Sequence, residues 1–372
     1  MSIDLLRLVA DQLKVGVPLP FGIRDMHGNL LLAKGRVITS DDQLEAVLER
    51  GLYCDHDDAH PDEAEGQTNK RPLTVFDLWK QTTARLDVLL NSMHKEGFGD
   101  RCDTFAGLFM DLVNKDPDIA IYQSVRQDPN RLSLYGLSHS LHCAMICQLA
   151  ALRVGWAPER VRTLVKAAMT MNLTIVEVQG RFATQGRLND TQREQIKAHP
   201  QEAVDKLQAA GITDPEWLQA VLEHHEHPDG SGYPARLTVQ CDMAQVLHMA
   251  DVFMAKISPR TERPALPILD AARQMFADAN GSPLAAAIIK EYGIYPPGNI
   301  VELASGEIAV VIRRGATAHT PTAAAVTDHH GIPVVRTTRR NTAEAAYAIK
   351  SSIPPSKMMM RVPPERLYGL VQ

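Results

Sequence analysis

The sequence predicts a mainly α-helical protein, with a small α+β module before the helices and a small β-rich element after them. Three observations support this fold class. Between residues 73 and 292, apolar residues recur at helical spacing in several long segments. Residues 15–51 have the pattern of two short strands around a turn, followed by a helix. Beyond residue 299, apolar runs typical of strands are broken by glycine-containing turns.

The N-terminal module is predicted to span residues 1–52. Asp25 to Asn29 supply turn residues between its strands, and Ser40 with Gln43 forms a predicted capping box for its helix. Residues 53–72 are polar and acidic, which is typical of a linker. The motif "CDHDDAH" in this segment contains metal-ligand residue types, but without a framework to fix their geometry we expect no site there.

The helical domain is predicted over residues 73–292. Pro158 is a favoured first residue of a helix, and Asp190 or Thr191 is the predicted start of another. The first helix, within "VFDLWKQTTARLDVLLNSM", either packs inside the domain, which we favour, or supports a homodimer. Residues 293–350 form the predicted β-rich element, and residues 351–372 a proline-rich tail that includes "KMMM".

Composition excludes several classes of protein. The net charge of −5 gives no general attraction to nucleic acid or to an anionic membrane, and no apolar run has the length of a membrane span. The five cysteines are scattered, without a CxxC pair or a disulfide framework. We therefore expect a cytoplasmic protein, with no nucleic-acid partner.

Histidines carry the chemistry of this sequence. The segment "LEHHEHPDGSGYP" (residues 222–234) places His224 and His225 side by side where Pro228 and Gly230 predict a helix end. His199, His139 and Asp251 lie on three other predicted helices, each within apolar sequence. Five such residues on separate helices are typical of a metal site inside a helical bundle.

The segment "HHEHPDGSGYP" resembles the HHExxDGxGYP signature of HD-GYP domains, metal-dependent phosphodiesterases that hydrolyse the bacterial second messenger cyclic di-GMP. The resemblance covers about residues 120–290 and implies an HD-GYP-type helical bundle in a bacterial protein. It implies that His139, His199, His224, His225 and Asp251 are metal ligands. Tyr135 precedes the first of these at a position where some members carry a glutamate ligand for a third metal.

The sequence departs from this family at its name-giving HD pair. The corresponding positions are Met171 and Asn172, and the lysine of the same motif falls on Ile175. In the family, the aspartate bridges two metal ions and the lysine lies near the scissile phosphate. Asn172 offers a neutral oxygen, and Met171 offers only a soft thioether.

Loss of the bridging carboxylate limits the expected metal content. Two divalent ions about 4 Å apart repel by about 17 kcal/mol at an effective dielectric constant near 20, and a bridging carboxylate offsets part of this. We expect at most one divalent ion (Fe, Mn or Zn), held by His199, His224 and His225, or none. His139, Asp251 and Asn172 then form a weaker second half of the site.

The resemblance also implies a ligand-binding side. Gly232, Tyr233 and Pro234 correspond to the GYP loop, and Arg260 with Arg263 lies in a stretch similar to the arginine-bearing segment of the family. These arginines offer bidentate phosphate contacts, although Arg263 is equally explained as solvated surface charge. Glu226 is predicted to orient a metal-bound imidazole. Cys143 and Cys147 are interpreted as packing residues.

Three functions follow, in order of preference. The first is a degenerate HD-GYP signalling protein that binds cyclic di-GMP, a metal or a protein partner with little or no turnover, because two groups that stabilise the transition state are replaced. The second is an active cyclic di-GMP phosphodiesterase with a remodelled site. The third is a non-catalytic scaffold that contacts a signalling partner through the GYP loop.

Overall fold

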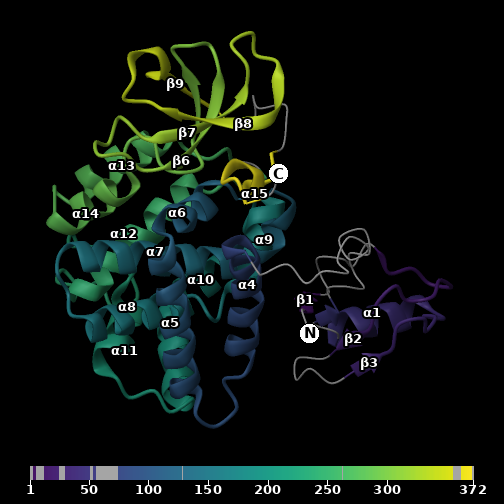
Figure 1. The fold of residues 1–372 in the computed structure, drawn as a ribbon. Helices are drawn as coiled ribbons and strands as arrows, with labels where there is room; N and C mark the ends of the chain where they lie inside the picture. Colours follow the sequence, from purple (N-terminus) through teal and green to yellow (C-terminus); the bar gives the residue numbers. More distant parts are fainter. Residues whose placement is uncertain are drawn as a thin grey trace. The chain divides into compact units, whose positions relative to one another are not determined.

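The computed structural model describes residues 3–5, 12–24, 30–50, 53–55, 74–127, 129–261, 263–354 and 362–370. The chain divides into two units, Met1–Ser92 and Met93–Gln372. The predicted turn at 25–29, the linker beyond residue 55 and the "KMMM" segment lie outside the described residues. The predicted fold class, mainly α with a β-containing module at each end, is confirmed (Figure 1).

The first unit contains a four-stranded antiparallel sheet in the order β1-β4-β2-β3. Its elements are β1 (Ile3–Leu5), β2 (Ile23–Arg24), β3 (Leu30–Leu32), α1 (Asp41–Arg50), β4 (Tyr53–Asp55) and α4 (Val75–Asn91). Phe21, Ile23, Ile38 and Cys54 are fully buried in its core. Because Cys54 on β4 belongs to this core, the module extends past residue 53, where the linker was predicted to begin.

Local chemistry explains where the helices of this unit start. The backbone N–H of Gln43 donates to the Ser40 hydroxyl, as predicted, but the Gln43 side chain accepts from the backbone of Thr39 and not from that of Ser40. A complete capping box instead starts α4, between Thr74 and Asp77. Phe76 and Trp79 on α4 are buried, and α4 lies in the first unit, whereas the helical domain was predicted to begin at residue 73.

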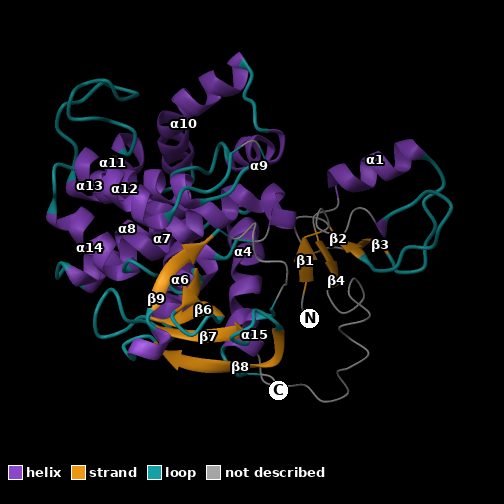
Figure 2. Ribbon diagram, turned by 90° about the horizontal axis from the view of Figure 1, so that it is seen from above, coloured by secondary structure: helices purple, strands orange, loops and turns teal. Residues whose placement is uncertain are grey.

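The helical part of the second unit is built around α7 (Tyr135–Arg153), which is buried along almost its whole length and packs against α8, α9, α12 and α14. Figure 2 shows these helices gathered together. The surrounding helices are α5 (Phe98–Lys115), α6 (Pro117–Val125), η3 (Pro129–Leu134), α8 (Pro158–Thr170), α9 (Val176–Gln185), α10 (Asp190–Ala209), α11 (Pro215–Glu223), α12 (Asp242–Ile257), α13 (Ile268–Asp278) and α14 (Pro283–Tyr292).

Most helix starts follow the sequence signals. Pro158 occupies the first turn of α8, as predicted. The cap of α10 is Asn189, one residue before the predicted position, and it exchanges hydrogen bonds with Gln192. Within the described part of the chain, no helix has the length and apolar character needed to cross a membrane.

The C-terminal element is a five-stranded antiparallel sheet in the order β8-β7-β6-β5-β9. Its strands are β5 (Ile300–Leu303), β6 (Ile308–Arg313), β7 (Thr322–Thr327), β8 (Pro333–Asn341) and β9 (Ile349–Ile353), with η4 (Ala345–Tyr347) before the last strand. The predicted tail contributes most of β9 and the short helix α15 (Pro364–Leu367), which packs against β8.

Charged residues join this sheet to the helices. The Arg314 side chain lies 2.6 Å from Asp118 on α6 and also pairs with Glu291 on α14, while Arg313 pairs with Asp116. All three carboxylates are largely buried. Arginines offset the cost of taking these carboxylates out of water; Glu291 is also paired with Arg153, and Asp118 with Arg313 at 3.6 Å.

We predict that Arg314→Met lowers the free energy of unfolding by about 2–3 kcal/mol, because Asp118 and Glu291 lose a partner in a largely buried position. Lys350→Met is the matched control, since the Lys350–Glu302 pair is exposed at 3.8 Å and contributes less than about 1 kcal/mol. Urea denaturation of both variants measures the difference. Equal stability of the two variants would contradict the prediction.

Candidate metal centre

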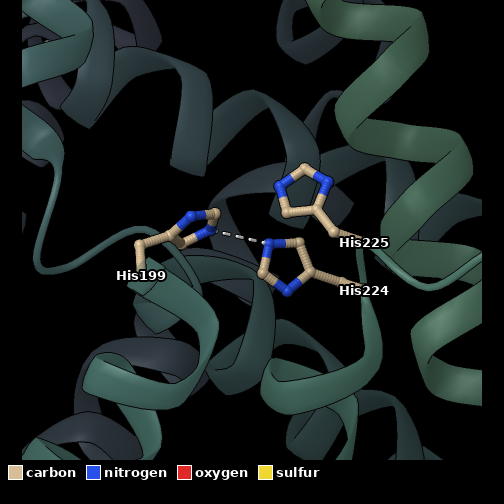
Figure 3. A group of neighbouring side chains, drawn as sticks. All are labelled: His199, His224 and His225. Carbon is tan, nitrogen blue, oxygen red and sulfur yellow. Dashed lines mark hydrogen bonds between the residues drawn. The ribbon is translucent and has the colours of Figure 1, made fainter. Parts of the chain in front are cut away.

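The bundle brings three predicted ligands, His199, His224 and His225, into one group (Figure 3). One nitrogen from each imidazole lies within 4.8 Å of the other two. His199 comes from α10, and the other two follow directly after the last residue of α11. The predicted helix end at this position is confirmed, and it allows two adjacent residues to reach one point.

A backbone carbonyl fixes the orientation of the His199 imidazole. Its Nδ1 donates to the carbonyl of Ile196 at 2.5 Å. In a regular helix that carbonyl accepts from the backbone N–H four residues later, but residue 200 is a proline and has no N–H. Pro200 therefore leaves the Ile196 carbonyl for the imidazole, and the Nε2 atom of His199 carries the lone pair.

His224 is oriented in the same way. Its Nδ1 donates to the carbonyl of Val221 at 2.6 Å, one of the last carbonyls of α11. In addition, Nδ1 of His248 on α12 donates to the backbone carbonyl of His224 at 2.9 Å. The lone pair of His224 is therefore on Nε2, which faces Nε2 of His199.

The two Nε2 atoms lie 3.1 Å apart, joined by the dashed line in Figure 3. Burial lowers the pKa of His199, lowers the pKa of His224 to about 3, and lowers that of His225 well below its usual value, so all three imidazoles are neutral near pH 7. Two lone pairs at this distance repel unless a cation lies between them. The separation is close to the about 3.0–3.4 Å expected for two nitrogens bound to one ion. The three-histidine group therefore fits a divalent metal.

A second group contains His139 on α7 and Asp251 on α12, both predicted ligands. His139 Nε2 lies 2.7 Å from the Asp251 carboxylate. Cys143, one turn further along α7, completes the group with its sulfur 3.6 Å from the same nitrogen. Sequence reasoning assigned Cys143 to packing; its spacing of four residues from His139, on one helix face, is the signal that places it with the ligands.

Tyr135 and Arg260 support this second group. The Arg260 guanidinium donates to the Tyr135 hydroxyl at 3.2 Å and lies over the rings of Tyr135 and Phe182. The Tyr135 hydroxyl is 3.3 Å from His139 Nδ1. Arg260 is thus connected to the candidate metal centre through Tyr135, as a partly buried positioning group. Arg263 is exposed and donates to the Ala255 carbonyl, which agrees with the surface-charge interpretation.

The GYP loop is packed directly on the histidines. The Tyr233 ring stacks on His225 with centroids 4.7 Å apart, and the backbone N–H of Tyr233 donates to the His225 carbonyl. The backbone φ of Gly232 is not in the left-handed region. A Cβ atom at this position would lie 2.5 Å from the Glu226 Cα and the His225 oxygen, so close approach of two backbone segments requires glycine.

Glu226 has a different role from the predicted one. Its carboxylate oxygens accept from the backbone N–H groups of Ala235 at 2.6 Å and Leu237 at 2.8 Å. Glu226 therefore holds the segment after Pro234, and the carbonyls of Ile196 and Val221 orient the imidazoles. Glu223 similarly accepts from the backbone N–H of Cys241 at the start of α12.

The positions that correspond to the HD pair lie at the end of α8. Met171, Asn172 and Ile175 are 0%, 1% and 3% exposed. The side-chain nitrogen of Asn172 has no hydrogen-bond partner among the described residues. These positions offer neither a carboxylate to bridge two ions nor a cation to contact a phosphate.

We expect His224→Ala to reduce the zinc content of the reconstituted protein by one ion per chain, because the three-histidine group loses a ligand. Affinity at that group should fall by more than about 100-fold. Metal analysis after dialysis measures the content. The exposed His319→Ala is the control and should retain all bound metal; unchanged content in His224→Ala would contradict the assignment.

We also predict that Gly232→Ala destabilises the protein by about 2 kcal/mol or more and weakens metal retention, because the added methyl group displaces the loop from His225. Gly107→Ala on α5 is the control, since its Cβ meets the Arg162 side chain only at 3.7 Å. That substitution in a helix should be neutral or stabilising. Thermal denaturation and metal analysis compare the two variants.

Comparison with known proteins agrees with this centre. Residues 108–281 match the HD domain family. A stretch of 134 residues is 32% identical to the cyclic di-GMP phosphodiesterase PA4108 of Pseudomonas aeruginosa, covering 35% of this chain and 32% of that protein. The match therefore spans about a third of the relative's length.

The fold resembles that of Bd1817, an HDG"Y"P protein from Bdellovibrio bacteriovorus, with a TM-score of 0.51 over 77% of this chain and 97% of that one. The sequence identity is 13%, so this likeness concerns the fold alone. His139, His199, His224, His225 and Asp251 all lie within residues 108–281. The segment that matches the HD domain family thus carries both ligand groups.

Proposed function

We propose that this chain is a degenerate HD-GYP signalling protein that binds cyclic di-GMP with little or no phosphodiesterase turnover. The observation that carries this proposal is Asn172, a buried neutral amide where the family has its bridging aspartate. Met171 and Ile175, both buried and apolar, accompany it in place of the histidine and the lysine. Three positions of the family's reactive centre are thus replaced together.

The consequence for catalysis follows from charge. Hydrolysis of a phosphodiester places negative charge on oxygens that metal ions and cationic side chains stabilise. A metal ion bound by His199, His224 and His225 supplies Lewis acidity and a site for water. The Asn172 side chain adds no negative charge to hold a second ion beside it, and Ile175 offers no cation.

The ligand-binding side retains its chemistry. Tyr233 presents a ring and a hydroxyl beside the three-histidine group, and Gly232 and Pro234 keep the loop against the backbone of His225 and Glu226. Arg260 adds a positive charge connected through Tyr135. A phosphate and a base of cyclic di-GMP, the substrate named for the P. aeruginosa relative, match these groups.

The intact three-histidine group supports one alternative, a cyclic di-GMP phosphodiesterase remodelled around a single ion. Its three nitrogens leave open coordination positions, which a catalytic ion requires. A scaffold that acts only through a signalling partner at the GYP loop is the remaining alternative. For all three we expect action in the bacterial cytoplasm, where cyclic di-GMP is the signal.

The test combines calorimetry and hydrolysis with cyclic di-GMP, using zinc-, iron- and manganese-loaded protein. We expect binding without turnover in the unmodified chain, and weaker binding in Tyr233→Ala. The double variant Met171→His, Asn172→Asp should gain hydrolysis by at least about 100-fold, since it restores the bridging carboxylate and a ligand. Adding His224→Ala to the double variant is the control and should remove the gained activity.

Other outcomes favour the alternatives. Turnover by the unmodified chain that disappears in His224→Ala would identify the remodelled hydrolase. Absence of both binding and turnover, in protein whose metal content is verified, would leave the scaffold. Each result contradicts the proposal in a distinct way.

A further inference from the structure

The second ligand group, His139, Cys143 and Asp251, is distinct from the three-histidine group in its donor atoms. It offers one nitrogen, one sulfur and one oxygen within 4.8 Å of one another. His139 and Cys143 are fully buried, and the Asp251 side chain is largely buried. The three come from two packed helices, α7 and α12, so their relative positions are set by the bundle core.

The spacing of Cys143 and His139 matches coordination of one ion. Zinc binds sulfur at about 2.3 Å and imidazole nitrogen at about 2.0–2.1 Å, so a tetrahedral site separates the two atoms by about 3.6 Å. The distance between Cys143 Sγ and His139 Nε2 is 3.6 Å. The Asp251 Oδ1 atom is hydrogen-bonded to His139 Nε2 at 2.7 Å. A metal ion bound to this nitrogen would displace the proton that the two atoms share.

We propose that His139, Cys143 and Asp251 form a zinc site of their own, separate from the three-histidine group. A thiolate selects zinc over the harder manganese and magnesium ions. Zinc bound here would take Cys143 as a thiolate, with the thiol proton released to solvent, and the His139 proton would be carried on Nδ1 instead of Nε2, facing the Tyr135 hydroxyl.

Charge explains how this site can be filled without the bridging aspartate. The Cys143 thiolate and the Asp251 carboxylate together carry two negative charges, which neutralise one divalent ion. A neutral zinc site no longer repels an ion held by His199 and His224 as a bare dication would. The proposal therefore departs from the single-ion expectation, in which His139 and Asp251 were a weak remainder and Cys143 had no part.

The second ring nitrogen of His139, Nδ1, has a partner that fixes the orientation of the imidazole. The Tyr135 hydroxyl lies 3.3 Å from His139 Nδ1, and Arg260 donates to that hydroxyl. Such a partner fixes the ring orientation of a metal-binding imidazole. This zinc site does not depend on whether the chain binds cyclic di-GMP, so its test is independent of that proposal.

The test uses the full chain, stripped of metal and reloaded with Co²⁺ as a spectroscopic substitute for zinc. We expect a cobalt–thiolate charge-transfer band in the near ultraviolet. The band should disappear in Cys143→Ser and remain in Cys147→Ser, the matched control one turn further along α7 and equally buried. It should also remain in His199→Ala, which removes only the ion of the three-histidine group.

Zinc content gives a second measure. Two zinc ions per unmodified chain should fall to one in Cys143→Ser and to one in His199→Ala. If Cys143→Ser fails to fold, the zinc X-ray absorption spectrum of the unmodified chain decides, because it should contain a sulfur shell at about 2.3 Å. No sulfur shell, or a cobalt band that survives in Cys143→Ser, would overturn the proposal, whatever the result of the cyclic di-GMP assays.

Discussion

The centre depends on one electrostatic constraint, the meeting of two imidazole lone pairs inside a helical bundle. The Nδ1 atoms of His199 and His224 both donate to backbone carbonyls, so their Nε2 atoms face each other at 3.1 Å without a proton between them. Burial keeps both rings neutral. The interior thus contains concentrated negative potential, and a cation is the group that relieves it. The surrounding loop, helix end and supporting carboxylates all serve to keep this arrangement in place.

Much of this arrangement follows from the sequence, because its causes are local. The end of α11 at His224, the start of α8 at Pro158 and the choice of five candidate ligands from four helices rest on patterns of a few residues. The partners of Glu226 could not be predicted in this way, because they are backbone groups of a loop whose path depends on packing. Cys143 is buried, as predicted for a packing residue, and its place beside His139 and Asp251 could not be read from the sequence, because a thiol on an apolar helix has the same pattern in either role. The extension of the N-terminal module into β4 was missed because its strand is short and polar residues follow it.

The two sides of the centre differ in what they retain. The α8 side has exchanged charged groups for Met171, Asn172 and Ile175, all accommodated in the core. The loop side keeps Gly232 and Tyr233 against the histidines, with contacts that leave almost no freedom for substitution. A protein that binds a nucleotide without hydrolysing it needs the loop side, which contacts the ligand, more than the α8 side. Because α7 contacts most helices of the bundle, a displacement of His139 or Tyr135 on α7 would be transmitted to those helices through packing contacts.

Pro200 has a consequence for the order in which this protein matures. By removing one helical donor, it assigns the Ile196 carbonyl to His199 through covalent structure alone, before any ion arrives. The orientation of this one imidazole is therefore set by folding, whereas zinc fingers fold only around their metal. We therefore expect a chelator to remove the ion while the helices persist, so that the centre can be reloaded without refolding of the chain.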